Sequence, residues 1–307
     1  MKDYVLKTNQ LSKQYKHQVA LNKVNLSIEK GSIYGFIGQN GAGKSTLTRI
    51  VAGLAMPSSG TVELFGESTE RKLIQARKRI GATIEQPAIY PHMTAAENLE
   101  AHRLLKGVPG KECVQKTLAL VGLHDTGKKK AKNFSLGMKQ RLILAIALLG
   151  DPEFLILDEP INGLDPMGVV EIRELLKKLN SEKGVTILIS SHILSELHLL
   201  ATHYGFIHKG ELIEQMTLNQ LEEKCQQYFH IKVDNTEKAA TILETVLSTN
   251  DFEVMPDGVI RLFTYLDQPA KVSTALVNAG LIIEQFKSMG QDLESYFTKL
   301  IGGIQHG

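Results

Sequence analysis

Eight consecutive residues, 38–45, have the residue types and the spacing that a polyphosphate site needs. They match the pattern G-x-x-x-x-G-K-[ST]. Glycines let the backbone approach the phosphates without Cβ clashes, so that successive N–H groups can point inward. Lys44 can reach the β- and γ-phosphates, and the hydroxyl of Ser45 suits Mg²⁺, a hard cation that takes oxygen ligands. We therefore predict a site for a nucleoside triphosphate, formed by Gly38, Gln39, Asn40, Gly41, Ala42, Gly43, Lys44, Ser45 and Thr46.

The residues around this loop predict the elements that must hold it. Residues 33–37 are an apolar run, typical of a buried parallel strand. After the loop, apolar side chains recur at helical spacing at Leu47, Ile50, Val51 and Leu54. A helix that starts here also directs the positive end of its dipole at the phosphates. An ordinary glycine-rich turn is the alternative, and the strand–loop–helix context argues against it.

Further polar residues follow two later apolar strands. Asp158 and Glu159 end the strand predicted at 154–157, and His192 follows the strand predicted at 185–189. Carboxylates at the end of a buried strand are costly unless a cation meets them. Open α/β sheets bind their ligands at this edge. We predict that these side chains belong to the phosphate site. A capped strand end and a packed or surface histidine are the alternatives.

The composition restricts the class of protein. A chain of 307 residues can form one large domain and a small one. The net charge of +2 gives no argument for nucleic-acid binding. Cys113 and Cys225 lie far apart and near no histidine cluster, which favours free thiols in a reducing compartment. The N-terminus lacks an apolar signal segment, and the longest apolar run, 142–149, is far shorter than the roughly 20 residues that span a bilayer. We expect a soluble, cytoplasmic protein that meets a membrane only through a partner.

The pattern of elements changes along the chain. Residues 5–28 predict strands, and Tyr15 among them could stack on an adenine ring or simply pack. Helices follow a capping box at Thr94 and Glu97, and an apolar helix is expected at 142–149, with residues 133–141 leading into it. After about residue 217 the predicted order is β-α-β-β-α-β, which indicates a small α+β, ferredoxin-like domain. We therefore expect one domain over 1–216 and an accessory domain over 217–307.

Six motifs in register resemble the ATP-binding subunit of an ABC transporter over about residues 1–216. They are the phosphate loop, Gln86, Ser135-Leu136-Gly137, Asp158-Glu159, Asp165 and His192. The resemblance implies an α/β fold of the P-loop NTPase (ABC ATPase) class. It also implies an antiparallel β subdomain and a helical subdomain at about 87–150.

The resemblance implies a role for each matching residue. Tyr15 stacks on the adenine of ATP, Gln86 touches Mg²⁺ and senses the membrane partner, and Asp158 holds Mg²⁺ through water. Glu159 is the general base for the attacking water, and His192 contacts the γ-phosphate. Ser135 and Gly137 meet the γ-phosphate bound to the opposite subunit of a homodimer. The dimer drives an integral-membrane permease on a separate chain, which docks at about 86–94.

Some positions depart from the usual pattern of the family. Leu136 replaces a glycine, Met138 replaces a glutamine, and Asn162-Gly163 stand where the family often has Ser-Ala. These variants and the C-terminal extension resemble the bacitracin and lantibiotic type of peptide-antibiotic export and immunity transporters. A non-transport ABC ATPase acting on ribosomes or nucleic acid is the alternative, but the chain has one cassette and only a short helical block. A P-loop kinase is a further alternative, which would not need the 135–137 segment or His192.

Overall fold

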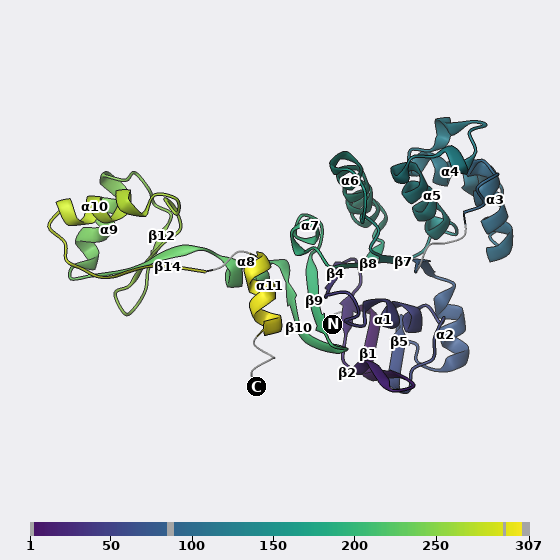
Figure 1. Cartoon of the computed structure of the whole chain (residues 1–307), viewed down its shortest axis with the longest axis horizontal. Coiled ribbons are helices and arrows are strands. Elements are labelled where there is room, and N and C mark those ends of the chain that lie inside the picture. The colour runs from purple at the N-terminus through teal and green to yellow at the C-terminus, as the bar shows by residue number, and fades with distance from the viewer. Residues whose placement is uncertain (1–2, 85–88, 291–292, 303–307) are drawn as a thin grey trace. The chain divides into compact units, whose positions relative to one another are not determined.

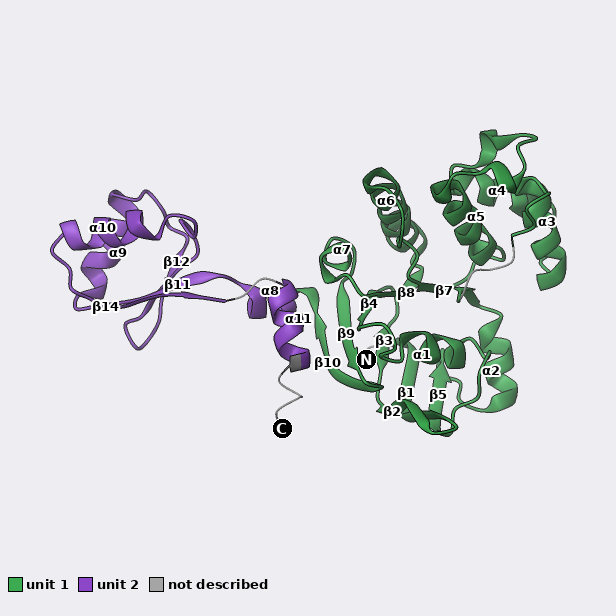
Figure 2. Cartoon of the chain, in the orientation of Figure 1, with its two compact units in different colours: residues 1–218 green, residues 219–307 purple. Residues whose placement is uncertain are grey.

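The computed structural model describes residues 3–84, 89–290 and 293–302 of the 307-residue chain. The chain divides into two compact units, Met1–Leu218 and Asn219–Gly307 (Figure 2). We call them unit 1 and unit 2. The boundary predicted from the sequence lies after residue 216.

The central sheet of unit 1 places its strands in the order β10-β9-β4-β8-β7-β6 (Figure 1). All neighbouring pairs are parallel except β10 with β9. The bounds are β4 Ile33–Ile37, β6 Ile80–Thr83, β7 Phe154–Asp158, β8 Thr186–Ser191, β9 His203–His208 and β10 Glu211–Thr217. Every residue of β4 and of β8 is buried. This explains their continuous apolar runs, because a parallel sheet is covered on both faces.

A second, antiparallel sheet packs beside it. Its strands are β1 Tyr4–Tyr15, β2 Gln18–Val24, β3 Ser27–Glu29 and β5 Ser59–Leu64, with β1 paired to the other three. One buried cluster joins residues of this sheet, such as Leu6 and Leu26, to Phe36 of β4 and Leu47 of α1. Full burial of each such side chain stabilises the fold by roughly 1.5–3 kcal/mol. This core fixes the strand and the helix between which the phosphate loop lies.

The helices of unit 1 include a block made of α3, α4 and α5 (Figure 1), of which α5 packs on β6 of the central sheet. The bounds are α1 Lys44–Val51, α2 Glu70–Arg77, α3 Ala95–Lys106, α4 Glu112–Leu120, α5 Leu136–Leu148, α6 Pro166–Lys183 and α7 Leu194–His198. Short 3-10 turns lie at His124–Thr126 and Ala131–Asn133. The capping box of Thr94 and Glu97 is present at the start of α3.

The predicted start of the helix at residue 142 is wrong. The helix α5 begins at Leu136, and its cap is Ser135, whose side chain accepts a hydrogen bond from the Met138 N–H. The polar segment 138–141 forms its first turns, while the apolar part from Leu142 onward is buried. The apolar pattern therefore marked only the buried part of the helix.

Unit 2 has the β-α-β-β-α-β order that the sequence predicts. The six elements of this order are β11 Tyr228–Val233, α9 Thr236–Thr245, β12 Phe252–Val254, β13 Ile260–Leu262, α10 Pro269–Asn278 and β14 Ile283–Met289. Helix α8, Leu218–Cys225, begins at the last residue of unit 1 and precedes them, and α11, Leu293–Gly302, follows them. The sheet order is β12-β13-β11-β14, and every neighbouring pair is antiparallel. Inward residues such as Phe229, Ile231 and Leu262 pack with Leu243 and Leu276 of the helices. The arrangement supports the ferredoxin-like interpretation, which stays a prediction.

Candidate nucleotide-binding site

The loop between β4 and α1 has the backbone that its glycines predict. Gly41 and Gly43 have φ angles of 81° and 112°, in the left-handed region that glycine alone adopts easily. A Cβ at Gly38 would lie 2.6 Å from the carbonyl oxygen of Ile207, and one at Gly43 would lie 2.6 Å from that of Ala20. No other residue fits at 38 or 43 without moving the backbone of β9 or β2.

Lys44 holds the loop and faces the carboxylates. Its Nζ donates to the carbonyl oxygen of Gly38 at 2.6 Å and to that of Gln39 at 3.3 Å. The side chain is only 5% exposed, and Nζ lies 3.5 Å from Oε1 of Glu159. A buried ammonium that already meets an anion is suited to meet phosphate oxygens in the same place.

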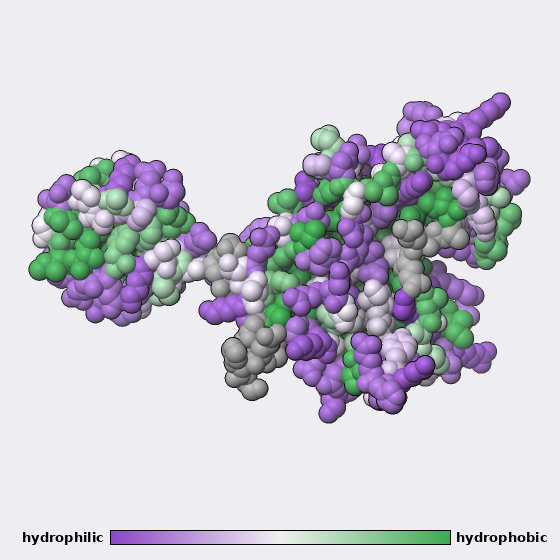
Figure 3. Space-filling model, viewed as in Figure 1, coloured by the Kyte–Doolittle hydropathy of each residue, from purple (hydrophilic) through white to green (hydrophobic). Residues whose placement is uncertain are grey.

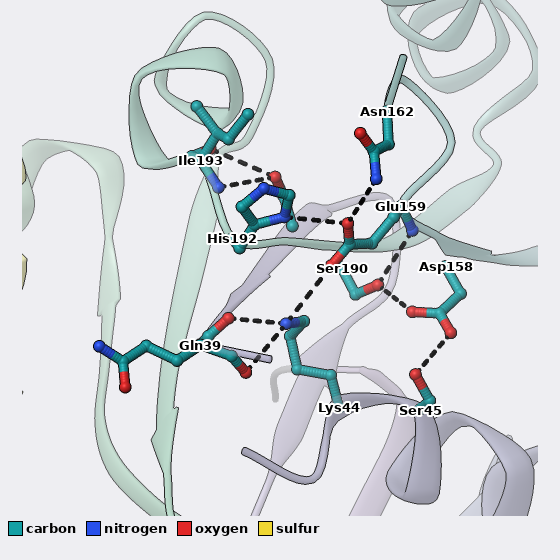
Figure 4. Close-up of polar contacts among 11 residues, drawn as sticks. Gln39, Lys44, Ser45, Asp158, Glu159, Asn162, Ser190, His192 and Ile193 are labelled. Carbon is teal, nitrogen blue, oxygen red and sulfur yellow. Dashed lines mark hydrogen bonds and ion pairs between the residues drawn. The ribbon is translucent and has the colours of Figure 1, made fainter. Parts of the chain in front are cut away.

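Asp158 and Glu159 extend from the carboxyl end of β7. Oδ2 of Asp158 accepts a hydrogen bond from Ser45 Oγ at 2.7 Å, and Oδ1 accepts one from Ser190 Oγ (Figure 4). Ser190 is the register partner of Asp158 across β7 and β8. A role for Ser190 was not predicted from the sequence, although its place two residues before His192 is a signal for one.

Glu159 is held by contacts to its carboxylate and to its backbone N–H. Its φ of 47° lies in the left-handed region, which is uncommon for a residue with a side chain. Oε2 contacts Nδ1 of His192 at 2.9 Å and accepts from Nδ2 of Asn162 at 3.3 Å (Figure 4). The Glu159 N–H donates to Ser190 Oγ at 3.2 Å. The contact with Asn162 was not predicted from the sequence.

A cavity of about 230 Å³ opens beside the loop. It is lined by Tyr15, Gln18, Ala20, Asn40, Gly41, Gly43, Lys44, Ser45, Thr46 and Glu159. Tyr15 is 41% exposed, and Nζ of Lys13 lies 4.8 Å from the centroid of its ring. An exposed aromatic ring at the edge of a phosphate site is placed to stack on a base.

The donors at this site fit Mg²⁺ shared with phosphate. Ser45 and Asp158 bring oxygen atoms together, the ligand type that Mg²⁺ prefers. In the described residues, no group of three or more His, Cys, Asp or Glu side chains gathers that could hold a metal ion by itself. Mg²⁺ usually keeps waters and binds through one or two protein groups plus substrate phosphates, so this donor set suits Mg²⁺ bound with a nucleotide.

Some predicted site residues are not brought to this cavity. Ser135 and Gly137 are not among the residues that line it, and Ser135 Oγ instead accepts from the Met138 N–H at 3.2 Å. Asp165 caps α6, and its Oδ1 accepts from the Gly168 N–H at 2.9 Å. The prediction for Gln86 falls outside the described residues.

Comparison with known proteins identifies the chain's family. The family described as ABC transporter matches residues 21–162. The bacitracin transport ATP-binding protein BcrA of Bacillus licheniformis is 42% identical over 299 residues, which are 97% of this chain and 98% of that protein. The chain belongs to the ABC transporter family. The lantibiotic transport ATP-binding protein SrtF of Streptococcus pyogenes is 44% identical over 68% of this ABC chain and 89% of its own length.

A solved structure supports the same assignment for the fold. The dimeric, post-hydrolysis structure of the ATP-binding cassette MJ0796, bound to ADP and Pi, has a TM-score of 0.63 and 28% identity. It covers 69% of this ABC chain, and the match covers 98% of MJ0796. The chain is therefore the ATP-binding and ATP-hydrolysing subunit of an ABC transporter, and it uses ATP with Mg²⁺.

The face of this ABC subunit drawn in Figure 3 is mixed in polarity. The view in Figure 3 shows hydrophobic residues in small groups among hydrophilic ones on each unit. No helix in the described part of the chain combines the length and the apolar character that crossing a bilayer requires.

Proposed function

We propose that this chain dimerises around ATP in the cytoplasm and drives a separate membrane permease that exports a peptide antibiotic or a similar amphipathic compound. The observation that carries the substrate class is the 42% identity to BcrA over 97% of the chain, because that alignment extends into unit 2. The match to SrtF, over 68% of the chain, supports the same class. Leu136, Met138 and Asn162-Gly163, where the chain departs from the usual family pattern, are the positions whose resemblance first suggested this subgroup.

The site residues divide into those that bind and those that react. The 38–46 loop and Lys44 hold the phosphates of ATP, and the ring of Tyr15 stacks on its adenine. Ser45, Asp158 and Gln86 would hold Mg²⁺, which neutralises charge on the phosphates when bound. Ser190 fixes Asp158 by donating a hydrogen bond to Oδ1, so that Oδ2 faces Ser45.

Hydrolysis requires a base next to the γ-phosphate. The Glu159 carboxylate takes a proton from the attacking water as the water oxygen bonds to the γ-phosphorus. The bond from that phosphorus to the bridging oxygen breaks, and ADP leaves with the electron pair. His192 holds Oε2 of Glu159 through Nδ1, so its Nε2 is the nitrogen left for the γ-phosphate. Its side chain is partly exposed, although it does not line the cavity beside the loop.

A second copy completes the site in this proposal. Ser135 and Gly137 do not line the cavity of their own chain, so they are available to a nucleotide held by another copy. Two copies related by a two-fold axis would each supply this segment to the other's ATP. The permease would dock beside α3, where Tyr90, Met93, Leu104 and Leu105 are exposed apolar residues.

The first experiment tests the catalytic role and the dimer together. Glu159→Gln should bind ATP, hydrolyse it about a hundredfold or more slowly, and accumulate as a dimer, since a general base contributes roughly 10²–10⁴-fold. Hydrolysis is measured as phosphate release, and dimer formation by sedimentation with ATP and Mg²⁺. Normal turnover would remove Glu159 from the role of base. A variant that stays monomeric with ATP, even beside its permease, would contradict the dimer.

The second experiment tests transport. Cells that express the chain with its permease should tolerate more bacitracin than cells that express Glu159→Gln with the same permease. An antibiotic that acts inside the cell is the control, and both strains should be equally sensitive to it. A pull-down from a detergent extract should recover a polytopic membrane protein. Recovery of ribosomes or nucleic acid instead would favour a non-transport ABC ATPase.

A further inference from the structure

We infer that Asn162 is a positioning residue that holds the Glu159 carboxylate for hydrolysis. The inference rests on the proposed role of Glu159 as the general base. Nδ2 of Asn162 donates to Oε2 of Glu159 at 3.3 Å, and Nδ1 of His192 contacts the same oxygen at 2.9 Å. Figure 4 shows Asn162 and His192 on different segments, converging on that one oxygen.

The other oxygen of Glu159 depends on a group that the nucleotide also needs. Oε1 lies 3.5 Å from Nζ of Lys44. A bound phosphate competes for this ammonium, because a phosphate oxygen carries more charge than a carboxylate oxygen. Once Lys44 pairs with phosphate, the groups that contact Oε2 still hold the Glu159 carboxylate in place. Asn162 is one of them, and it carries no charge that would oppose the phosphate.

The turn that presents Asn162 is itself well defined. The Asn162 N–H donates to the Glu159 carbonyl oxygen at 3.3 Å, which closes a tight turn between these two residues. The next residue, Gly163, has a φ of 76°, a conformation that favours glycine. A Cβ placed on Gly163 would lie 3.5 Å from Cδ2 of Leu136, so this leucine packs over the turn. The leucine and the glycine, both departures from the family pattern, therefore face each other.

Asn162 is placed to act on the rate and not on nucleotide affinity. Its side chain is exposed, and it does not line the nucleotide cavity. A serine, which the family often has here, carries a hydroxyl on Cβ and has no carboxamide, so it lacks the Nδ2 donor that Asn162 brings to Glu159. An alanine at 162 would remove the donor without disturbing any buried group.

Steady-state kinetics test the inference. Asn162→Ala should lower kcat about tenfold, which corresponds to about 1.4 kcal/mol, while KM for ATP changes less than twofold. Asn162→Asp should lower kcat further, because it places a carboxylate beside the Glu159 carboxylate. Asn278→Ala, the same change at an exposed residue of unit 2, is the matched control and should keep the normal kcat. A normal kcat in Asn162→Ala, with Glu159→Gln inactive, overturns the role of Asn162 and leaves the proposed function intact.

A double-mutant cycle separates positioning from a general structural effect. If Asn162 acts through the charge of Glu159, adding Asn162→Ala to Glu159→Gln should change the slow residual hydrolysis less than twofold. Single-turnover assays over hours can measure this rate. A further tenfold fall in the double variant would show that Asn162 acts by another route and would overturn the inference. Normal hydrolysis in Glu159→Gln alone would instead overturn the proposed function.

Discussion

Replacing Ser135 tests whether one side chain serves both the stability of the helical block and the chemistry. Ser135 is the cap of α5, with extended backbone angles of φ −62° and ψ 165°, and its Oγ accepts from the Met138 N–H at 3.2 Å. Alanine removes this acceptor, and loss of such a cap costs about 1 kcal/mol, in a range of roughly 0.5–2. For a unit of this size, about 1 kcal/mol lowers Tm by roughly 2–4 °C. Glycine is a good cap residue and should cost only a few tenths of a kcal/mol.

The two substitutions at Ser135 therefore differ in stability but not in activity. Thermal unfolding followed by circular dichroism should give Ser135→Ala a Tm roughly 2–4 °C lower, and Ser135→Gly a Tm within about 1 °C of the native chain. Both lack the hydroxyl proposed to meet the γ-phosphate of the opposite copy, so both should lose ATP hydrolysis and ATP-dependent dimers to the same extent. Ser135→Thr keeps a capping hydroxyl and is the control. Equal Tm values for the alanine and glycine variants would refute the capping argument.

Two other substitutions test separate parts of unit 1. Tyr15→Ala should raise the Kd for ATP by about tenfold, because stacking on a base contributes roughly 1–3 kcal/mol, and unchanged affinity in a nucleotide titration would remove Tyr15 from the site. Hydrogen bonds from Arg79 lower the pKa of Glu153 in the folded chain, and the closest contact is 2.6 Å. The stability from this pair is then present above the unfolded-state pKa of about 4.3 and is lost as pH falls through the lower folded value. Because both side chains are partly exposed, Glu153→Gln should cost under about 1 kcal/mol at pH 7 in urea unfolding, and its curve should meet that of the native chain below about pH 4; a constant difference at all pH values would contradict this.

The parts of the fold that could be predicted are those whose pattern is local. The strand 33–37 and the capping box at Thr94 follow from residues next to each other in the sequence, and the structure has both. The strand β5, Ser59–Leu64, was not predicted, because only Val62 and Leu64 in it are buried and the rest is polar. The start of α5 was missed for the related reason that its first turns mix apolar with charged residues and are not buried.

The parts of the site that could not be predicted depend on pairing between distant segments. Ser190 reaches Asp158 because β7 and β8 pair with these two residues in register, and no local pattern states that register. Asn162 reaches Glu159 because the turn between them closes with a left-handed φ at Glu159. The motif at 38–45 needs no such information, since its backbone N–H groups and Lys44 come from one continuous segment.

The contacts of Glu159 connect nucleotide binding to the readiness of the base. With Lys44 paired to it at 3.5 Å, the carboxylate and the ammonium satisfy each other inside the site. If Lys44 pairs with a γ-phosphate, the Glu159 carboxylate loses its cation and lies beside the phosphate, which is also an anion. Like charges this close repel strongly in a partly buried site. In the proposed mechanism Oε1 then leaves Lys44, while Oε2 keeps its contacts with His192 and Asn162. If Glu159 is the base, as we propose, nucleotide binding and its release from Lys44 would be one event, and the base would be freed only when phosphate is bound.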